Sequence, residues 1–154
     1  MIDPRALRSL LLDHDGVSLL LPHRPPLLLV DGVTAIADTP PALRAFKHIT
    51  LDEPVLAGHF PAQPLWPAVY CVEGLAQTCA LLGALRAGAG VEAPPIVVVA
   101  AADVKFTMPV RPGQRLDYLV VLTHTVGPVF RFDVEATVAG RVAARGRLTL
   151  AVPT

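Results

Sequence analysis

Residues 67–86 read Pro-Ala-Val-Tyr-Cys-Val-Glu-Gly-Leu-Ala-Gln-Thr-Cys-Ala-Leu-Leu-Gly-Ala-Leu-Arg, the longest apolar helical pattern in the chain. Pro67 suits the first turn of a helix, and Gly88 or Gly90 suits its end. The stretch is apolar nearly all round, and a helix of that kind is buried on most of its sides. We therefore expect one long helix at the centre of the molecule.

A hydrophobic period of two residues replaces the helical pattern towards the end of the chain. Residues 130–138 and residues 142–150 alternate apolar with polar side chains. This alternation predicts two antiparallel strands with one wet face, joined by a turn at Ala139-Gly140. We therefore expect a hairpin that buries only one face against the rest of the molecule.

Four further stretches have the composition of strands, and they are residues 26–37, 42–50, 95–107 and 115–125. Within the third stretch, residues 95–104 are apolar on both faces, so both faces should be covered. A short amphipathic helix is expected over residues 4–13, and a proline-rich loop over residues 54–66. The simplest packing wraps a long antiparallel sheet round the central helix, which is an α+β fold in a single domain of residues 1–154.

The composition narrows the class of protein. Hydrophobic residues make up 53% of the chain and charged residues only 17%, so we expect excess apolar surface to lie in a subunit interface. The formal net charge is zero, which provides no basic field for nucleic acid. Glu73 interrupts the best candidate for a membrane span, so we expect none. Cys71 and Cys79 lie two helical turns apart, too far for a disulfide, and we expect buried thiols in a reducing cytoplasm.

Two ionisable residues lie in otherwise apolar stretches of the sequence. His59 lies in the loop sequence Gly58-His59-Phe60-Pro61, and Glu73 follows fourteen residues later inside the apolar helix. Burying an ionisable group in apolar surroundings costs free energy unless the group is paired or has a function. If His59 and Glu73 lie at one apolar site, they could act as a base and an acid that move protons on and off a substrate. Gln77, one helical turn after Glu73, could hold the carboxyl group by a hydrogen bond.

Each of these residues also has a structural interpretation. His59 could simply hydrogen-bond a backbone carbonyl, Glu73 could pair with a buried arginine or a backbone amide, and Gln77 could lie at the helix surface. His23, which lies in a proline-rich loop, could equally be structural. The other histidines have no metal-ligand spacing, and the sequence has neither a glycine-rich phosphate loop nor a Gly-x-Ser-x-Gly motif. We therefore expect no metal site, no cofactor and no nucleophilic mechanism.

Three stretches carry a resemblance to a known family. They are Leu21-Pro22-His23-Arg24-Pro25-Pro26-Leu27-Leu28-Leu29-Val30-Asp31, then Gly58-His59-Phe60-Pro61 with Glu73-Gly74-Leu75-Ala76-Gln77, and Asp103-Val104-Lys105-Phe106 with Pro109-Val110-Arg111-Pro112-Gly113-Gln114. On these motifs, the chain resembles the FabZ-type 3-hydroxyacyl-(acyl carrier protein) dehydratases, a family with the hotdog fold. The resemblance spans residues 21–114, and the later hairpin fits the same fold.

The resemblance implies an activity, a site and an assembly. The family converts 3-hydroxyacyl thioesters on an acyl carrier protein to trans-2-enoyl thioesters, in fatty-acid or in polyketide and polyene biosynthesis. In the family, the histidine and the glutamate come from different subunits and meet at a dimer interface. His59 would then remove the proton next to the thioester carbonyl, and Glu73 of the partner subunit would protonate the 3-hydroxyl group. A homodimer is expected, with a trimer of dimers or a heterodimer with a paralogue as alternatives.

The resemblance also implies which residues bind the substrate. The backbone N–H of Ala68 would stabilise the thioester oxygen, and Trp66, Phe60 and Gln77 would contact the substrate. The chain departs from the family pattern, which usually has Met-Pro-Gly where Trp66-Pro67-Ala68 stands and glycine where Ala62 stands. We expect these changes to alter the acyl pocket or to weaken the contact with the oxygen, because glycine allows the closest approach to the backbone.

Two other functions stay open. A thioesterase could use the same fold. Alternatively, the chain could be a degenerate, non-catalytic subunit that completes a heterodimeric dehydratase. The changes from glycine to alanine favour this hypothesis, whereas the presence of His59 and Glu73 argues against it. If an acidic carrier protein binds, Lys105, Arg111 and Arg115 are the candidate contacts, although a solvated face explains them equally well.

Overall fold

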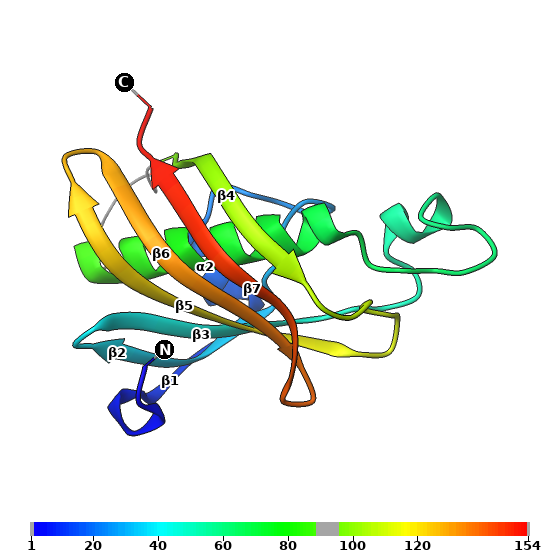
Figure 1. The fold of residues 1–154 in the computed structure, drawn as a ribbon, viewed down its shortest axis with the longest axis horizontal. Helices are drawn as coiled ribbons and strands as arrows, with labels where there is room; N and C mark the ends of the chain where they lie inside the picture. The colour runs from blue at the N-terminus through cyan, green and yellow to red at the C-terminus, as the bar shows by residue number, and fades with distance from the viewer. Residues whose placement is uncertain (1, 89–95, 154) are drawn as a thin grey trace.

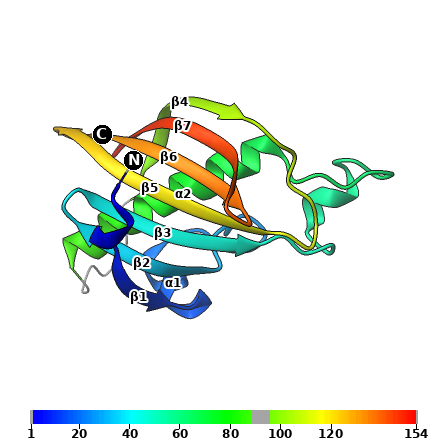
Figure 2. The ribbon, with the colours of Figure 1, turned by 60° about the horizontal axis from the view of Figure 1, so that its bottom comes forward.

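A computed structural model describes residues 2–88 and 96–153 of the chain. The strands of these residues form one antiparallel sheet in the order β1-β2-β3-β5-β6-β7-β4. Their bounds are β1 Arg8–Leu12, β2 Gly32–Asp38, β3 Pro41–His48, β4 Val98–Phe106, β5 Arg115–Val126, β6 Val129–Val138 and β7 Arg141–Ala151. The sheet curves round the long helix α2, Ala68–Ala87 (Figures 1 and 2). The predicted α+β arrangement, with a sheet wrapped round one helix, is therefore confirmed.

The helix α2 forms where the sequence predicts it. Pro67 is the capping residue just before the first turn, and the helix ends at Gly88, whose φ of 91° favours glycine. Gly90, the alternative end, lies outside the described residues. By length and apolar composition α2 would also pass as a membrane span, but 56% of its most apolar window is buried inside the fold, as expected for a core helix.

Gly74 lets α2 approach the sheet closely. A Cβ atom at this position would lie 2.2 Å from the hydroxyl oxygen of Tyr118, a fully buried residue of β5. Any side chain there would push the helix away from the sheet. The glycine, which directly follows Glu73, therefore allows the short distance between α2 and the sheet.

The predicted hairpin near the end of the chain is confirmed. β6 and β7 pair from Val129 with Ala151 to Val138 with Arg141. Ala139 and Gly140 both have positive φ, 49° and 77°, which matches the twist of a tight two-residue turn.

The prediction for the N-terminus is wrong. Residues 4–13 form no α-helix; a short 3₁₀ turn at Pro4–Ala6 leads into β1. Leu10 and Leu12 pack against the core while Leu11 is 77% exposed, so the period here is two. The helix of this region is α1, His14–Leu20, and Asp13 caps it by accepting a hydrogen bond from the Gly16 N–H at 2.9 Å.

The strand predicted over residues 26–37 begins too early. β2 starts only at Gly32, and the preceding backbone pairs with a side chain rather than with a strand. The Leu29 N–H donates to Gln77 Oε1, and the Leu27 carbonyl accepts from Gln77 Nε2, both at 2.8 Å. An apolar segment is thus held against α2 by one buried amide.

The covered strand predicted over residues 95–104 is wrong for the single chain, and Pro95 itself lies outside the described residues. β4 is an edge strand that pairs only with β7. Val98 is 45% exposed and Val99 is 40% exposed, although they point to opposite faces. Within one chain only Val104 of this strand packs against the core, and the other residues of β4 are exposed.

Candidate active site

His59 lies in the segment of residues 54–66, which projects beyond the N-terminal end of α2 (Figures 1 and 2). This segment begins with the short 3₁₀ helix Pro54–Ala57. The His59 N–H donates to the carbonyl oxygen of Val55, the second residue of that helix. The His59 carbonyl accepts from the Leu65 N–H at 2.9 Å, which closes the loop. The loop therefore holds the imidazole through backbone hydrogen bonds on both sides.

The imidazole of His59 has a defined tautomer. Its Nδ1 lies 2.8 Å from the Leu65 carbonyl oxygen, and because a carbonyl only accepts, Nδ1 must donate. The neutral ring then carries its lone pair on Nε2. The ring also stacks on Phe60, with ring centroids 4.1 Å apart, and Phe60 is itself 51% exposed. The structural interpretation of His59 is thus correct for one nitrogen, and it leaves the other free to act as a base.

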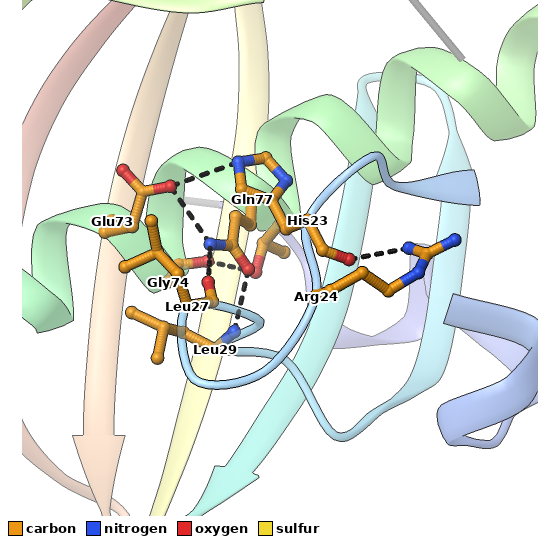
Figure 3. A network of polar contacts seen from close by, with 8 residues as sticks. His23, Arg24, Leu27, Leu29, Glu73, Gly74 and Gln77 are labelled. Atoms are coloured by element: carbon orange, nitrogen blue, oxygen red, sulfur yellow. Dashed lines mark hydrogen bonds and ion pairs between the residues drawn. The ribbon is translucent and has the colours of Figure 1, made fainter. Parts of the chain in front are cut away.

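Glu73 lies on α2 with its carboxyl group held by two side chains (Figure 3). Gln77 Nε2 donates to Glu73 Oε1 at 3.0 Å, so the predicted hydrogen bond between these residues is confirmed. His23 Nε2 lies 3.4 Å from the same oxygen. The side chain of Glu73 is 32% exposed, which leaves the carboxyl group accessible from one side.

Gln77 is occupied by the protein. It is 1% exposed, its oxygen accepts from Leu29, and its amide nitrogen donates to both Leu27 and Glu73. These contacts give Gln77 a structural role as the connection between the segment before β2 and the carboxyl group. A direct contact of Gln77 with substrate stays a prediction.

His23 is the neighbour of Glu73 that the sequence reasoning did not assign to the site. It comes from the loop between α1 and β2, fifty residues before Glu73 in the sequence. The only local signal was its position in the stretch 21–31, between prolines. That pattern indicates a rigid loop but not the partner to which the loop delivers the ring.

Two adjoining cavities lie along α2. A cavity of about 260 Å³ is lined by His23, Glu73 and Gln77, with Val98 and Val99 of β4 on the other side. A larger cavity of about 480 Å³, towards the end of α2, has mostly apolar walls. Both are lined by the same three residues, Ala80, Val97 and Leu150. The carboxyl group of Glu73 is thus next to a space suited to an apolar chain.

His59 and Glu73 are not brought together within one chain. Among the residues that the structure describes, no hydrogen bond or ion pair joins them, and His59 lines none of the cavities described here. The segment that carries His59 projects away from the body of the molecule, whereas Glu73 lies over the second turn of α2 (Figure 1). Within one chain, the described residues thus leave the candidate base and the candidate acid apart.

Trp66 and Ala68 line a separate cavity of about 360 Å³ beside Cys71 and the stretch 106–110. Trp66 is 5% exposed, packs edge-on against Tyr70 and donates its backbone N–H to Val110 at 2.8 Å. Ala68 is exposed and is the first residue of α2, where a backbone N–H has no partner inside the helix. The indole thus fills the wall of this cavity while the N–H of Ala68 stays free to donate.

A buried cation supports the base of the His59 loop. Lys47, at the end of β3, is 7% exposed in its side chain, and its Nζ lies 2.6 Å from Glu53 Oε1 and 3.8 Å from Asp31 Oδ1. The same Nζ lies 5.6 Å from the centre of the Trp66 ring. Because Glu53 directly precedes the segment of residues 54–66, this cluster connects the loop to β3. The sequence pattern does not reveal this cluster, because a lysine on a strand is usually solvated.

The cysteines are unsuited to nucleophilic catalysis. Cys71 and Cys79 are free and buried, as predicted. Burial raises the pKa of the Cys71 thiol to about 12, and it raises the pKa of Cys79 well above its usual value. Among residues 2–88 and 96–153, no three histidine, cysteine, aspartate or glutamate side chains are grouped closely enough to hold a metal ion.

Solved structures place the fold in a known class. A dehydratase heterocomplex, ApeI:P from Xenorhabdus doucetiae, matches with a TM-score of 0.76 and 21% identity, over 90% of this chain and 91% of that one. The fluoroacetyl-CoA thioesterase FlK matches with a TM-score of 0.57 and 15% identity, over 71% of this chain and 83% of that one. Such likenesses show the fold alone. The chain is a hotdog-fold protein with an imidazole at His59 and a carboxyl group at Glu73, both in largely apolar stretches of sequence.

The sequence comparisons narrow this class to a family. The model of the FabA-like domain matches residues 21–147, and the chain belongs to this family. The 3-hydroxyacyl-(acyl-carrier-protein) dehydratase FabZ of Anaeromyxobacter dehalogenans strain 2CP-1 is 41% identical over 140 residues, which are 90% of this chain and 89% of that protein. The FabZ of Aromatoleum aromaticum is 38% identical over 93% of this chain and 99% of its own length. The resemblance stated from the motifs is confirmed.

Proposed function

We propose that the chain is a dehydratase that converts 3-hydroxyacyl thioesters of a carrier protein to trans-2-enoyl thioesters. The observation that carries this proposal is the identity of 36–41% to three FabZ dehydratases over 90–93% of the chain, and this chain has a histidine at position 59 and a glutamate at position 73. The mostly apolar cavity beside Glu73 supports an acyl chain as the rest of the substrate. The reaction is an elimination with no net oxidation or reduction, so its balance requires no redox cofactor.

In the proposed mechanism, His59 is the base. Its Nδ1 donates to the Leu65 carbonyl, so the lone pair on Nε2 is available to take the C2 proton of the thioester. The C–H bond breaks, and its electron pair forms the C2–C3 double bond. The thioester oxygen gains negative charge in this step, and the N–H of Ala68 at the start of α2 is the proposed donor to that oxygen.

Glu73 is the proposed acid. It donates its proton to the 3-hydroxyl group as the C3–O bond breaks, and water leaves. The step ends with a carboxylate on Glu73 and an imidazolium on His59, and one proton returned from His59 to Glu73 through solvent restores both groups. Trp66 and Phe60 are proposed as walls of the substrate site, because one lines the cavity beside Ala68 and the other stacks on the base.

The proposed assembly is a homodimer that joins His59 of one protomer to Glu73 of the partner subunit. The edge strand β4 supports it, because its nine residues are apolar except for Asp103 and Lys105, and an unpaired edge strand is a template for a second strand. Phe106, at the end of β4, and Val69, on α2, are 45% and 70% exposed and would be covered in such a dimer. A heterodimer with a paralogue, or a trimer of dimers, are the alternative outcomes of an oligomer measurement.

The proposed partner is an acidic carrier protein in the cytoplasm. Lys105 and Arg111 are exposed, and they support a docking surface beside the cavity of Trp66. Arg115 is a weaker candidate, because its guanidinium already pairs with Asp117 at 2.7 Å and lies over the Phe46 ring. Charge reversal of Arg111 should weaken carrier affinity, and unchanged affinity would remove this part of the proposal.

One assay tests the proposed reaction. The purified protein is given 3-hydroxyacyl and 2-enoyl thioesters on a carrier protein, and hydration, dehydration and free thiol are followed. Interconversion that is lost in both His59→Ala and Glu73→Gln supports the dehydratase. Thiol release without interconversion would instead identify a thioesterase. Inactivity of the chain alone, with activity restored by a paralogous subunit, would identify a non-catalytic partner in a heterodimer.

A further inference from the structure

Nitrogen atoms of two side chains lie beside one oxygen of Glu73. Gln77 Nε2 and His23 Nε2 lie 3.0 Å and 3.4 Å from Oε1, and Figure 3 shows them approaching the carboxyl group from α2 and from the loop before β2. Within the described part of the chain, no side chain or backbone group donates to Oε2. The two oxygens of the carboxyl group are therefore unlike.

This asymmetry decides where a neutral Glu73 carries its proton. A protonated carboxyl group has one O–H oxygen and one oxygen that only accepts. Two N–H donors aimed at Oε1 are compatible with an accepting oxygen and would repel a proton placed on it. The proton of neutral Glu73 therefore belongs on Oε2, the oxygen without a donor among the described residues.

The state of His23 follows from its other nitrogen. His23 Nδ1 is buried and has no hydrogen-bond partner among the described residues. A proton on Nδ1 would leave a buried donor unsatisfied, so the neutral ring with its proton on Nε2 fits the site. The guanidinium of Arg24 faces away to the Leu21 and His23 carbonyls, and the opposite wall of the cavity is formed by valines of β4.

The loop holds His23 in this place through its backbone. Gln77 binds the Leu27 carbonyl and the Leu29 N–H, and Arg24 closes the preceding turn by donating to the Leu21 carbonyl at 2.8 Å. Gln77 thus contributes one donor to Glu73 and also anchors the loop that contributes the second. His23 and Gln77 thus both lie beside Glu73 Oε1, and the hydrogen bonds of Gln77 to Leu27 and Leu29 hold the loop that carries His23.

We propose that His23 is a positioning residue for Glu73, which donates from Nε2 to Oε1 and so directs the acidic proton of Oε2 toward the leaving hydroxyl group. The inference rests on the proposed function, since it assigns Glu73 the role of acid. It adds to that function a third side chain, which does not touch the substrate and acts only on the protonation geometry of the acid.

The test compares two leaving groups in the full-length protein. His23→Met removes the donor and keeps an apolar side chain, whereas His23→Gln keeps an N–H donor. Each variant receives 3-hydroxyacyl and 3-chloroacyl thioesters of equal chain length on a carrier protein. Chloride leaves without being protonated, so elimination from the chloro compound needs only the base.

With the hydroxyacyl substrate, we expect His23→Met to lower kcat about 10- to 100-fold with KM unchanged, as for a misplaced catalytic group. With the chloroacyl substrate, its kcat should match the wild type, which also demonstrates an intact fold and base. His23→Gln should recover most of the lost hydroxyacyl turnover. An equal loss with both substrates, a Gln variant no better than the Met variant, or wild-type dehydration by His23→Met would each overturn the inference.

The Glu73→Gln variant separates this inference from the proposed function. It should lose hydroxyacyl turnover and keep chloroacyl elimination. If it does so while His23→Met behaves as the wild type, the dehydratase stands and the role of His23 falls. If Glu73→Gln still dehydrates the hydroxyacyl thioester, Glu73 is not the acid and both proposals fall.

Discussion

The imidazole Nδ1 of His59 lies 2.8 Å from the backbone carbonyl oxygen of Leu65. Because the carbonyl only accepts, Nδ1 carries the proton of the neutral ring and the lone pair lies on Nε2. Among the described residues, no hydrogen bond or ion pair joins this imidazole to Glu73, which lies on α2 while the loop projects beyond the N-terminal end of that helix (Figure 1).

The first prediction concerns complementation between inactive protomers. His59→Ala and Glu73→Gln should each lower kcat by about 10²- to 10⁴-fold, as for loss of a general base or acid. Unfolded together, mixed and refolded, they should recover about a quarter of wild-type activity, because half the dimers are mixed and each has one intact composite site. A mixture that stays as inactive as its components would place both residues in a site within one chain.

The second prediction concerns Ala68. Replacing Ala68 by glycine removes a methyl group beside the N–H that is proposed to bind the thioester oxygen, so turnover should stay unchanged or rise. Steady-state kinetics with a series of acyl chain lengths would measure it. A large drop in kcat would mean that the cavity lined by Trp66 and Ala68 is adapted to the methyl group.

The third prediction concerns the depth of α2. Gly74→Ala would place a Cβ atom 2.2 Å from the Tyr118 hydroxyl, so the free energy of unfolding should fall by about 1–3 kcal/mol through overpacking. Gly83→Ala is the matched control on the same helix, because nothing lies within 4 Å of its Cβ position. The control should be stabilised by about 0.8–1 kcal/mol through helix propensity. Urea unfolding measures both, and equal effects would contradict the close approach at Gly74.

The fourth prediction concerns Lys47. Lys47→Met keeps most of the apolar stem but leaves Glu53, whose side chain is 14% exposed, without its cation. Breaking a buried pair in this way should lower the free energy of unfolding by about 3–5 kcal/mol. Arg5→Met, which breaks an exposed pair with Asp3, should have no measurable effect on urea unfolding. If both variants unfold at the wild-type midpoint, the cluster does not stabilise the loop.

The fifth prediction concerns alkaline pH. Burial raises the pKa of Cys71 from 9.0 to about 12, so the unfolded chain loses this proton at lower pH than the folded one. The contribution is fully present below pH 9.0 and is lost as pH rises towards 12, by about 1.4 kcal/mol per pH unit. Urea unfolding between pH 8 and about 10.5 should show this loss, with a smaller slope in Cys71→Ala. An identical slope in the variant would contradict the raised pKa.

The elements that could be predicted from the sequence are those whose pattern is local. The apolar run of residues 67–86 predicted α2 to within one residue at each end, and the alternation of residues 130–150 predicted the hairpin with its turn at Ala139-Gly140. It also singled out Glu73 and Gln77, because a carboxyl group on an apolar helix has a neighbour one turn away. Side chains three or four residues apart on a helix are neighbours whatever the rest of the fold does.

Contacts between groups far apart in the sequence became visible only in the folded chain. It turned residues 8–12 into an edge strand, left β4 without a neighbour on one side, and delivered His23 to Glu73 across fifty residues of sequence. Periodicity reports which face of an element is apolar, but not which surface will cover it. The partner of Glu73 depends on how a proline-rich loop packs against α2, and that is set by the sum of many contacts rather than by local pattern.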